Sequence, residues 1–200
     1  MNCEESPTTK QKIIQVTMEI IAEEGFHNIT IRKIAARAHV NIAAVNYHYG
    51  SKDGVIDAAL ATVTDEMRKA FTLLTDDRQD VKTRLLEFIN HYTDVIHKYP
   101  DLIKNMIDHA IHNKPLDKHA EYMTFLKIEG IALMKMTIAE IRPEASKEEL
   151  YMFTLHLLSA LSFPILMGDY IGEMMGVDLK EEKVRHIYVK TLLQSVLDSH

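Results

Sequence analysis

Apolar residues recur along this chain at the three- and four-residue spacing that places them on one face of a helix. Residues 8–24 show the pattern first, with an apolar face of Ile13, Val16, Ile20 and Ile21. Thr8 and Gln11 match a capping box at the start of this segment, and Gly25 follows its end, where glycine commonly ends a helix. No window shows the alternation typical of a strand. The pattern therefore predicts an all-α protein.

Longer apolar faces follow in the rest of the chain. They predict helices over residues 52–74, 78–98, 101–112, 116–141, 146–167 and 180–198. Gly130 weakens the fourth of these segments, and Pro164 predicts a kink in the fifth because proline removes a helical hydrogen bond. A domain boundary is expected near residues 50–54 with no flexible linker, because the next helix begins at once.

Two short helices precede that boundary. Residues 30–38 and 42–49 both have helical periodicity, and a turn of three residues, 39–41, joins them. Thr30 and Asn41 stand where N-cap residues are preferred. Two short helices joined by a tight turn are the helix-turn-helix pattern, in which the second helix enters the major groove of DNA.

The second short helix has one face to anchor it and one face to expose. Val45 and Tyr49 are four residues apart, so they share a face and can pack on Ile34 and Ala35. The side chains expected to point outward are Ala43, Ala44, Asn46, Tyr47 and His48. Among them Asn46 can make a bidentate contact to adenine, and the two alanines let the backbone approach the bases.

Phosphate contacts are expected around the same helix. Arg32 and Lys33 lie in the first turn of residues 30–38, Lys52 begins the next helix, and Tyr47 and His48 can donate to phosphate oxygens. The predicted DNA-binding residues are Thr30, Arg32, Lys33, Asn41, Ala43, Ala44, Asn46, Tyr47, His48 and Lys52.

The charge distribution agrees with this interpretation without requiring it. The net charge is −6, which argues against indiscriminate binding of nucleic acid. Residues 27–54 nevertheless hold four cationic side chains and a single carboxylate. A polyanion-facing segment would show this asymmetry, and so would an ordinary fluctuation of charge.

The single cysteine, Cys3, cannot form an internal disulfide, and the polar start "MNCEESPTTK" is unlike a signal peptide. The longest apolar run, residues 157–167, is shorter than the roughly 20 residues that a membrane-spanning helix needs. We therefore expect a cytoplasmic protein with no membrane partner.

Residues 10–60 resemble the DNA-binding domain of the TetR family of transcriptional regulators. The resemblance rests on Glu-Gly-Phe after the first helix, Thr30 before the second, "IAARA" within it, and Asn-Tyr-His-Tyr followed by Ser51 and Lys52. It implies a helix-turn-helix domain over residues 1–54 and a helical effector-binding and dimerisation domain over residues 55–200. It also implies phosphate contacts by Tyr47 and Lys52 and a base or phosphate contact by Arg32.

The sequence departs from the family pattern at two positions. His39 stands in the turn where glycine is usual, which would cost a fraction to about 1 kcal/mol if the position keeps a positive φ. Asn46 replaces a common tyrosine, which should change the preferred operator.

The C-terminal helices carry the predictions on partners. Broad apolar faces on the last two long helices predict a homodimer interface that includes Phe153, Leu157, Leu161, Ile187 and Leu192. Abundant methionine, with recurring histidine and tyrosine, predicts a pocket for a small apolar or amphipathic effector, with candidate residues His91, His109, Tyr122, Met123, Met134 and Met167. Ordinary core packing is the alternative explanation of both features.

The resulting hypothesis is a ligand-responsive repressor that binds a palindromic double-stranded DNA operator as a homodimer. His109 and His112 could share a metal, but no third ligand is evident, so no metal or cofactor is predicted. The sequence lacks a nucleophile elbow, a phosphate loop and a His-Glu-x-x-His motif, so an enzyme is not expected. A helical adaptor that binds another protein, without DNA, remains the alternative.

Overall fold

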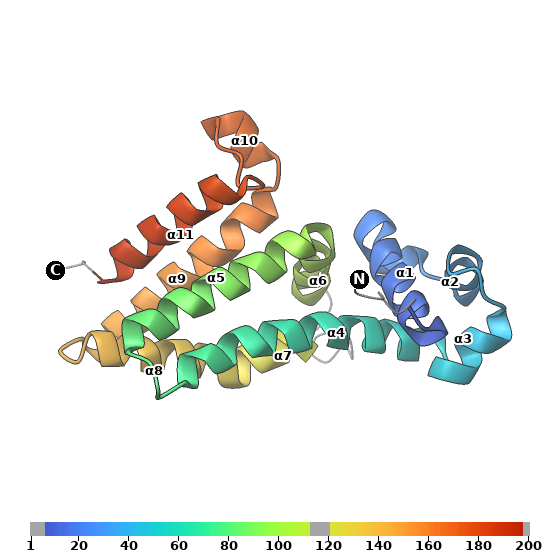
Figure 1. The fold of residues 1–200 in the computed structure, drawn as a ribbon, viewed down its shortest axis with the longest axis horizontal. Coiled ribbons are helices and arrows are strands. Elements are labelled where there is room, and N and C mark those ends of the chain that lie inside the picture. The colour runs from blue at the N-terminus through green and yellow to red at the C-terminus, as the bar shows by residue number, and fades with distance from the viewer. Residues whose placement is uncertain (1–6, 113–120, 198–200) are drawn as a thin grey trace, which may run out of the picture. The chain divides into compact units, whose positions relative to one another are not determined.

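The computed structural model describes residues 7–112 and 121–197, and gives only the backbone for residues 109–112, 121–122 and 165 (Figure 1). All regular elements in these ranges are helices, as predicted. The chain divides into two compact units. One unit comprises Met1–Thr64 with Asp101–Tyr122, and the other comprises Asp65–Pro100 with Met123–His200.

The first unit begins with the four helices that the sequence predicts. They are α1 (Thr9–Glu24), α2 (Ile31–Arg37), α3 (Ile42–Tyr49) and the start of α4 (Lys52–Thr72). Thr8 and Gln11 form the complete capping box at α1, and Gly25 ends this helix with a φ of 76°. A short 3-10 turn over Phe26–Asn28, which the periodicity did not reveal, leads into α2.

Helix α6 (Pro100–His112) belongs to the first unit from Asp101 onward, although it lies far along the chain. Its buried residues are Leu102, Ile103 and Met106. The side-chain amide of Asn105 donates to the carbonyls of Ile21 at 3.1 Å and Ala22 at 3.3 Å, which belong to the last turns of α1. Carbonyls in the last turn of a helix have few donors within that helix and can accept from other side chains. This contact therefore ties α6 to the end of α1. The compact units thus do not follow the expected boundary at residue 54.

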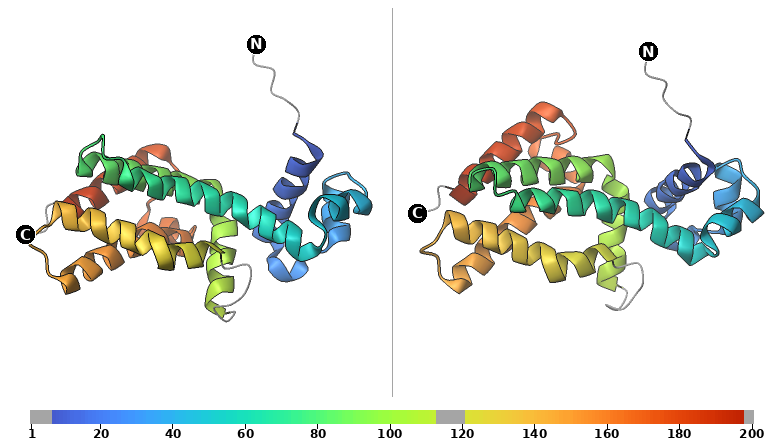
Figure 2. Two further views of the ribbon diagram at one scale, coloured as in Figure 1. Left: turned by 90° about the horizontal axis from the view of Figure 1, so that it is seen from below. Right: turned by 60° about the horizontal axis from the view of Figure 1, so that its bottom comes forward.

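The second unit is a bundle of the remaining long helices. It contains α5 (Val81–Lys98), α8 (Ile131–Ile141), α9 (Lys147–Met167) and α11 (Glu182–Leu197), with the short α10 (Tyr170–Met175) between the last two (Figures 1 and 2). Another 3-10 turn, Leu73–Thr75, extends α4. Helix α9 continues through Pro164, and α10 was not predicted.

An aromatic cluster forms the centre of this bundle. The Phe71 ring lies 4.9 Å from Phe88, 5.9 Å from Tyr92 and 5.2 Å from Phe125, measured between centroids. Offset and edge-to-face pairs of this kind stabilise a core beyond the area that they bury.

The predicted helix over residues 116–141 is interrupted near Phe71. The segment is divided into α7 (Glu121–Phe125), a π-helical turn over Leu126–Gly130, and α8. Gly130 is buried, and a Cβ atom there would lie 3.0 Å from the Phe71 ring. Gly130 therefore permits the aromatic ring to approach the helix backbone. The sequence had indicated that this glycine weakens the predicted helix.

None of the helices in the described ranges combines the length and the apolar character needed to cross a bilayer.

Candidate DNA-binding surface and ligand cavity

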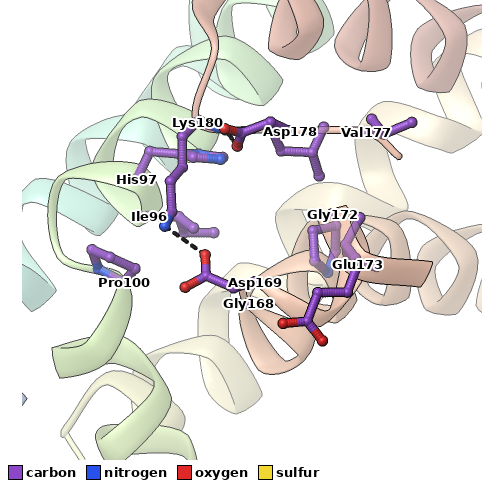
Figure 3. Close-up of a pocket in the computed structure, with 13 residues that line it drawn as sticks. Ile96, His97, Pro100, Gly168, Asp169, Gly172, Glu173, Val177, Asp178 and Lys180 are labelled. Carbon is purple, nitrogen blue, oxygen red and sulfur yellow. Dashed lines mark hydrogen bonds and ion pairs between the residues drawn. The ribbon is translucent and has the colours of Figure 1, made fainter. Parts of the chain in front are cut away.

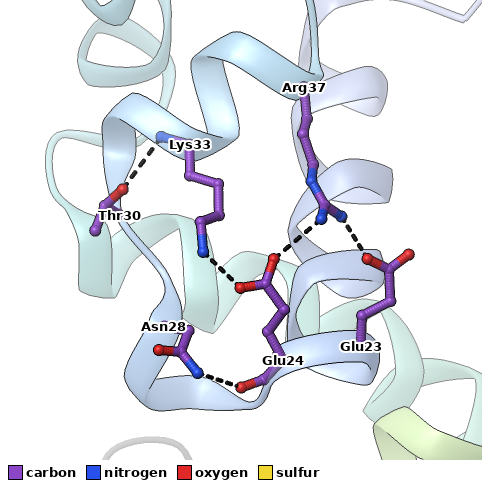
Figure 4. A network of polar contacts seen from close by, with 6 residues as sticks. All are labelled: Glu23, Glu24, Asn28, Thr30, Lys33 and Arg37. Atoms are coloured by element: carbon purple, nitrogen blue, oxygen red, sulfur yellow. Dashed lines mark hydrogen bonds and ion pairs between the residues drawn. The ribbon is translucent and has the colours of Figure 1, made fainter.

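A polar network fixes α2 against α1 (Figure 4). The guanidinium of Arg37 reaches Glu23 at 2.7 Å and Glu24 at 3.0 Å, and Lys33 Nζ lies 2.5 Å from the second oxygen of Glu24. The hydrogen bond from Lys33 holds the pKa of Glu24 below its usual value. These side chains are between 29% and 58% exposed, so solvent screens the ion pairs and the network orients α2 more than it stabilises the domain.

The turn between α2 and α3 is a Schellman motif. The Val40 N–H donates to the Ala35 carbonyl at 3.0 Å, and the His39 N–H donates to Ala36 at 3.3 Å. His39 has a φ of 55°, the left-handed conformation in which glycine is favoured. The conditional prediction of backbone strain at His39 therefore applies to this structure.

Helix α3 is anchored at both ends. Asn41 caps it, with its Oδ1 accepting from the Ala44 N–H at 2.6 Å. Val45 is completely buried beneath the helix. The hydroxyl of Tyr49 donates to the backbone carbonyl of Lys10 at 2.9 Å, which ties the end of α3 to the start of α1. Desolvation by burial raises the pKa of Tyr49.

The opposite side of α3 is open. Tyr47 is 85% exposed, and Ala43, Asn46 and His48 are exposed beside it. Ala44 differs from its prediction, because it is half-buried where an outward position was expected. The exposed side chains offer an amide, a phenol and an imidazole on a helix that is held from behind. This is the geometry that a major-groove reading helix requires.

The junction between α3 and α4 is tight. Gly50 ends α3 with a φ of 75°, and Ser51 Oγ accepts from the Gly54 N–H at 3.0 Å at the start of α4. A Cβ atom at Gly54 would lie 2.3 Å from the carbonyl oxygen of Tyr49. Only glycine fits there, and this close approach was not evident from the sequence.

The cationic candidates for phosphate contact divide into two groups. Arg32 and Lys52 are exposed and form no ion pair with another described residue. Lys33 was predicted to face phosphate, but its ammonium is directed at Glu24 (Figure 4). Thr30 is exposed, and its hydroxyl accepts from the Lys33 N–H at 3.1 Å as an N-cap. Lys33 and Thr30 thus have structural roles in the free protein.

The second unit contains a cavity of about 460 Å³ (Figure 3). The end of α5, the first residue of α6, the end of α9, α10 and the loop before α11 surround it. Its apolar wall consists of Ile96, Pro100, Pro164, Ile171, Val177 and Leu179. Its polar groups are His97, Asp169, Glu173, Asp178 and Lys180. A mainly apolar pocket with a few polar groups is typical of small-molecule sites.

The predicted effector residues do not gather at this cavity. His91 is exposed on α5, Met134 is fully buried in the core, and Met123 and Met167 are half-buried. None of these four residues lines the cavity. The side chains of His109 and Tyr122 lie outside the part that the structure describes. Methionine content thus indicated core packing at Met134. His97 lies in a predicted helix but was missed because a single histidine does not mark a cavity, and the loop of residues 176–181 was missed because it has no periodic pattern.

The predicted dimer residues also divide. Leu157, Leu161 and Leu192 are buried within the chain itself and are not available to a partner. Phe153 is half-buried, and its ring packs 4.6 Å from the guanidinium carbon of Arg142. Ile187, in contrast, is 59% exposed. The helical pattern could not distinguish the inward face of α9 from its outward face, because both are apolar.

A different face of α9 is exposed and apolar. Its members are Met152, Leu155, Phe163 and Leu166. With Ser159 between them, they follow the three- and four-residue spacing of one helix face.

No group of three potential metal ligands is found among the described residues.

Comparisons with known proteins agree with this architecture. Residues 13–59 match the model of the bacterial regulatory proteins of the tetR family. YttP of Bacillus subtilis strain 168, named "Probable HTH-type transcriptional regulator", is 23% identical over 194 residues, 94% of each chain.

Solved structures resemble the whole chain. A TetR-family transcriptional regulator from Bordetella parapertussis superimposes with a TM-score of 0.73 at 15% identity, covering 98% of this chain and 97% of that one. The ketosteroid transcriptional regulator KstR2 of Mycobacterium tuberculosis gives a TM-score of 0.73 at 14% identity, covering 96% of each chain. At these identities the solved structures establish the fold alone. The matched family and the relatives found by sequence are regulators of transcription and not enzymes.

Proposed function

Because this chain belongs to the TetR family of DNA-binding transcriptional regulators, we propose that it is a repressor that binds a palindromic operator as a homodimer. We further propose that a small apolar or amphipathic effector releases it from DNA. A regulator that acts on chromosomal DNA would work in the cytoplasm.

The exposed side of α3 carries the proposal of sequence-specific binding. Asn46 is the exposed side chain of this helix that can read adenine through two hydrogen bonds. Tyr47 and His48 lie beside it, while Arg32 and Lys52 are free to reach phosphates on either side. We propose these five residues as the main DNA contacts, with Thr30, Lys33, Asn41, Ala43 and Ala44 as the supporting set.

A homodimer follows from the size of the reading surface. One helix of the length of α3 contacts only a few base pairs, so a two-fold pair of such helices is needed to select a site. The exposed apolar face of α9, with Ile187 on α11, is the surface that we propose for the partner subunit. Phe163→Glu and Leu155→Glu should give monomers in analytical ultracentrifugation. Glu144→Lys, at an exposed site before α9, is a charge-changing control that should remain dimeric.

The cavity beside α10 supports regulation by a ligand. Pro100 lines the cavity and is also the first residue of α6, which bears the Asn105 contact to α1. A ligand that displaced Pro100 would therefore act on a helix bonded to the DNA-binding unit. The effector must bind the DNA-free form more tightly than the DNA-bound form, because only differential affinity shifts the equilibrium.

Selection of duplexes from a random pool by the purified protein tests the function. The proposal predicts enrichment of a palindrome with two half-sites. Enrichment of a single half-site would contradict the dimer, and enrichment of no sequence would favour a protein-binding adaptor. Repeating the selection with Asn46→Ala should alter the enriched half-site.

A further inference from the structure

The cavity beside α10 has an apolar wall and an acidic rim. Ile96, Pro164 and Leu179 belong to the apolar wall. The hydrocarbon part of a ligand could pack on this wall without forming hydrogen bonds. The charged groups that line it are Asp169, Glu173, Asp178 and Lys180, so the cavity has two more negative than positive side chains. These charged side chains are exposed, so water screens them, and their excess negative charge gives a modest preference for a cationic over an anionic head group.

His97 provides no positive charge to balance this rim. Its Nδ1 lies 2.7 Å from the Thr93 carbonyl, which can only accept, so Nδ1 carries the hydrogen and Nε2 of the neutral ring is an acceptor. Burial of the ring lowers the pKa of His97 and keeps it neutral near pH 7. Its ring is directed toward the cavity (Figure 3).

The positive group in the lining is already paired. Lys180 Nζ lies 2.5 Å from Asp169 Oδ1 and closes one side of the cavity in Figure 3. The Lys180 backbone N–H donates to Asp178 Oδ1 at 2.8 Å, which fixes the loop that carries the lysine. An entering carboxylate would meet the neutral Lys180–Asp169 pair and the two further carboxylates of Glu173 and Asp178. An entering ammonium would meet the carboxylate of Asp169, with Lys180 as its competitor.

We propose that this cavity binds an amphiphilic monocation, whose ammonium replaces Lys180 at Asp169 while its alkyl part packs on the apolar wall. The side chains of Lys180 and Asp169 are 71% and 77% exposed, so water compensates most of the cost of separating them. Exchange would break the ion pair between this loop and Asp169, whereas Arg185 would still donate to the backbone carbonyls of Leu179 and Lys180. The inference rests on the proposed function only in placing the effector in this cavity.

A matched series of eight-carbon compounds tests the charge preference. Octylamine, octanol and octanoate share one alkyl chain and differ in the head group. Isothermal titration of the full-length protein without DNA at pH 7.5 should give the affinity order octylamine, then octanol, then octanoate. Binding of octanoate as tightly as octylamine would overturn the proposal.

Two substitutions test the position of the ammonium. Asp169→Asn should lower the affinity for octylamine about fivefold, which is the upper range for an exposed ion pair. The affinity for octanol should not change. Lys180→Gln should strengthen octylamine by up to about fivefold, because it removes the competitor. Glu181→Gln removes an exposed carboxylate of the same loop that does not line the cavity, so it should change neither affinity.

The outcomes separate this inference from the proposed function. An equal effect of Asp169→Asn and Glu181→Gln would show a general electrostatic effect and reject the assigned site. Release of operator DNA by octanoate with no binding of octylamine would reject the cationic ligand and retain the ligand-responsive repressor. Binding of octylamine as predicted, with no ligand able to release DNA, would retain the site and reject the repressor mechanism. Unchanged thermal unfolding of the variants excludes misfolding as the cause.

Discussion

The hydroxyl of Tyr188 on α11 donates a hydrogen bond to the backbone carbonyl of Ala160 on α9. This carbonyl would normally accept from the residue four positions later, which is Pro164, and proline has no N–H. Tyr188 therefore replaces the donor that Pro164 removes. Burial of the phenol also raises its pKa. The pair explains how the helical hydrogen-bonding of α9 continues past Pro164.

Tyr188→Phe should consequently lower the free energy of unfolding by about 1–2 kcal/mol, because it leaves a partly buried acceptor without a donor. The same substitution in a Pro164→Ala background should cost much less, since the alanine N–H restores the helical bond. Urea denaturation of the four proteins in this cycle measures the difference. An equal cost in both backgrounds would show that Tyr188 acts by packing alone. Tyr170→Phe, at an exposed tyrosine of α10, is a neutral control.

The strained position in the turn makes a second prediction. His39 has a φ of 55°, its side chain is exposed, and its backbone N–H completes the Schellman motif. His39→Gly should raise the free energy of unfolding by about 0.5–1 kcal/mol, since relief of strain exceeds the extra entropy of the unfolded chain. His39→Ala removes the same imidazole without relieving the strain and should give no gain. Thermal and urea unfolding of both variants would measure this, and a gain with alanine would refute the backbone explanation.

Local signals in the sequence predicted much of the first unit, because the chain within four residues determines them. The caps at Thr8, Thr30 and Asn41 and the turn at His39 are of this kind. Contacts between distant residues could not be read in this way. The bond from Tyr49 to Lys10 spans 39 positions and joins groups that are unremarkable in sequence.

The second unit was harder to predict for a related reason. Helix α9 carries apolar residues on both its inward and its outward face. Periodicity alone therefore assigned Leu157 and Leu161 to the dimer interface, although they are buried in the chain's own core. The cavity depends on the loop of residues 176–181, which has no periodic pattern. Only tertiary packing decides such features.

Tyr49 and Tyr47 are two residues apart on α3 and should respond differently to the same substitution. Tyr49→Phe removes the bond to Lys10 and should lower the free energy of unfolding by about 0.5–1.5 kcal/mol. Tyr47→Phe should leave stability unchanged, because Tyr47 is exposed, and should weaken binding to DNA instead. Urea denaturation and a gel-shift titration on the same samples separate the two effects. Equal destabilisation by both would disprove the anchoring role.

Asn46 and Lys52 should separate specificity from affinity. Asn46→Ala should reduce discrimination at one base pair of each half-site by about 1–3 kcal/mol. Lys52→Ala should weaken binding to all duplexes alike and should reduce the slope of log affinity against log salt by about 0.9 for each phosphate that the protein no longer neutralises. Fluorescence anisotropy with the selected operator and a single-base variant, at several salt concentrations, measures both. A change of base preference with Lys52→Ala would contradict the assignment of roles.

His97 should make the stability of the protein depend on pH. Burial lowers its pKa in the folded state below the value near 6.5 of an unfolded chain, and the nearby Arg185 adds to the shift. The unfolded state therefore binds the proton first as pH falls through this range. The contribution of the neutral ring is complete above about pH 7 and is lost progressively below it. The free energy of unfolding should thus decrease more between pH 7.5 and pH 5.5 in the wild type than in His97→Gln. His91→Gln, at an exposed site on the same helix, should retain the wild-type dependence on pH. Parallel profiles for the wild type and His97→Gln would show that this ring does not titrate with folding.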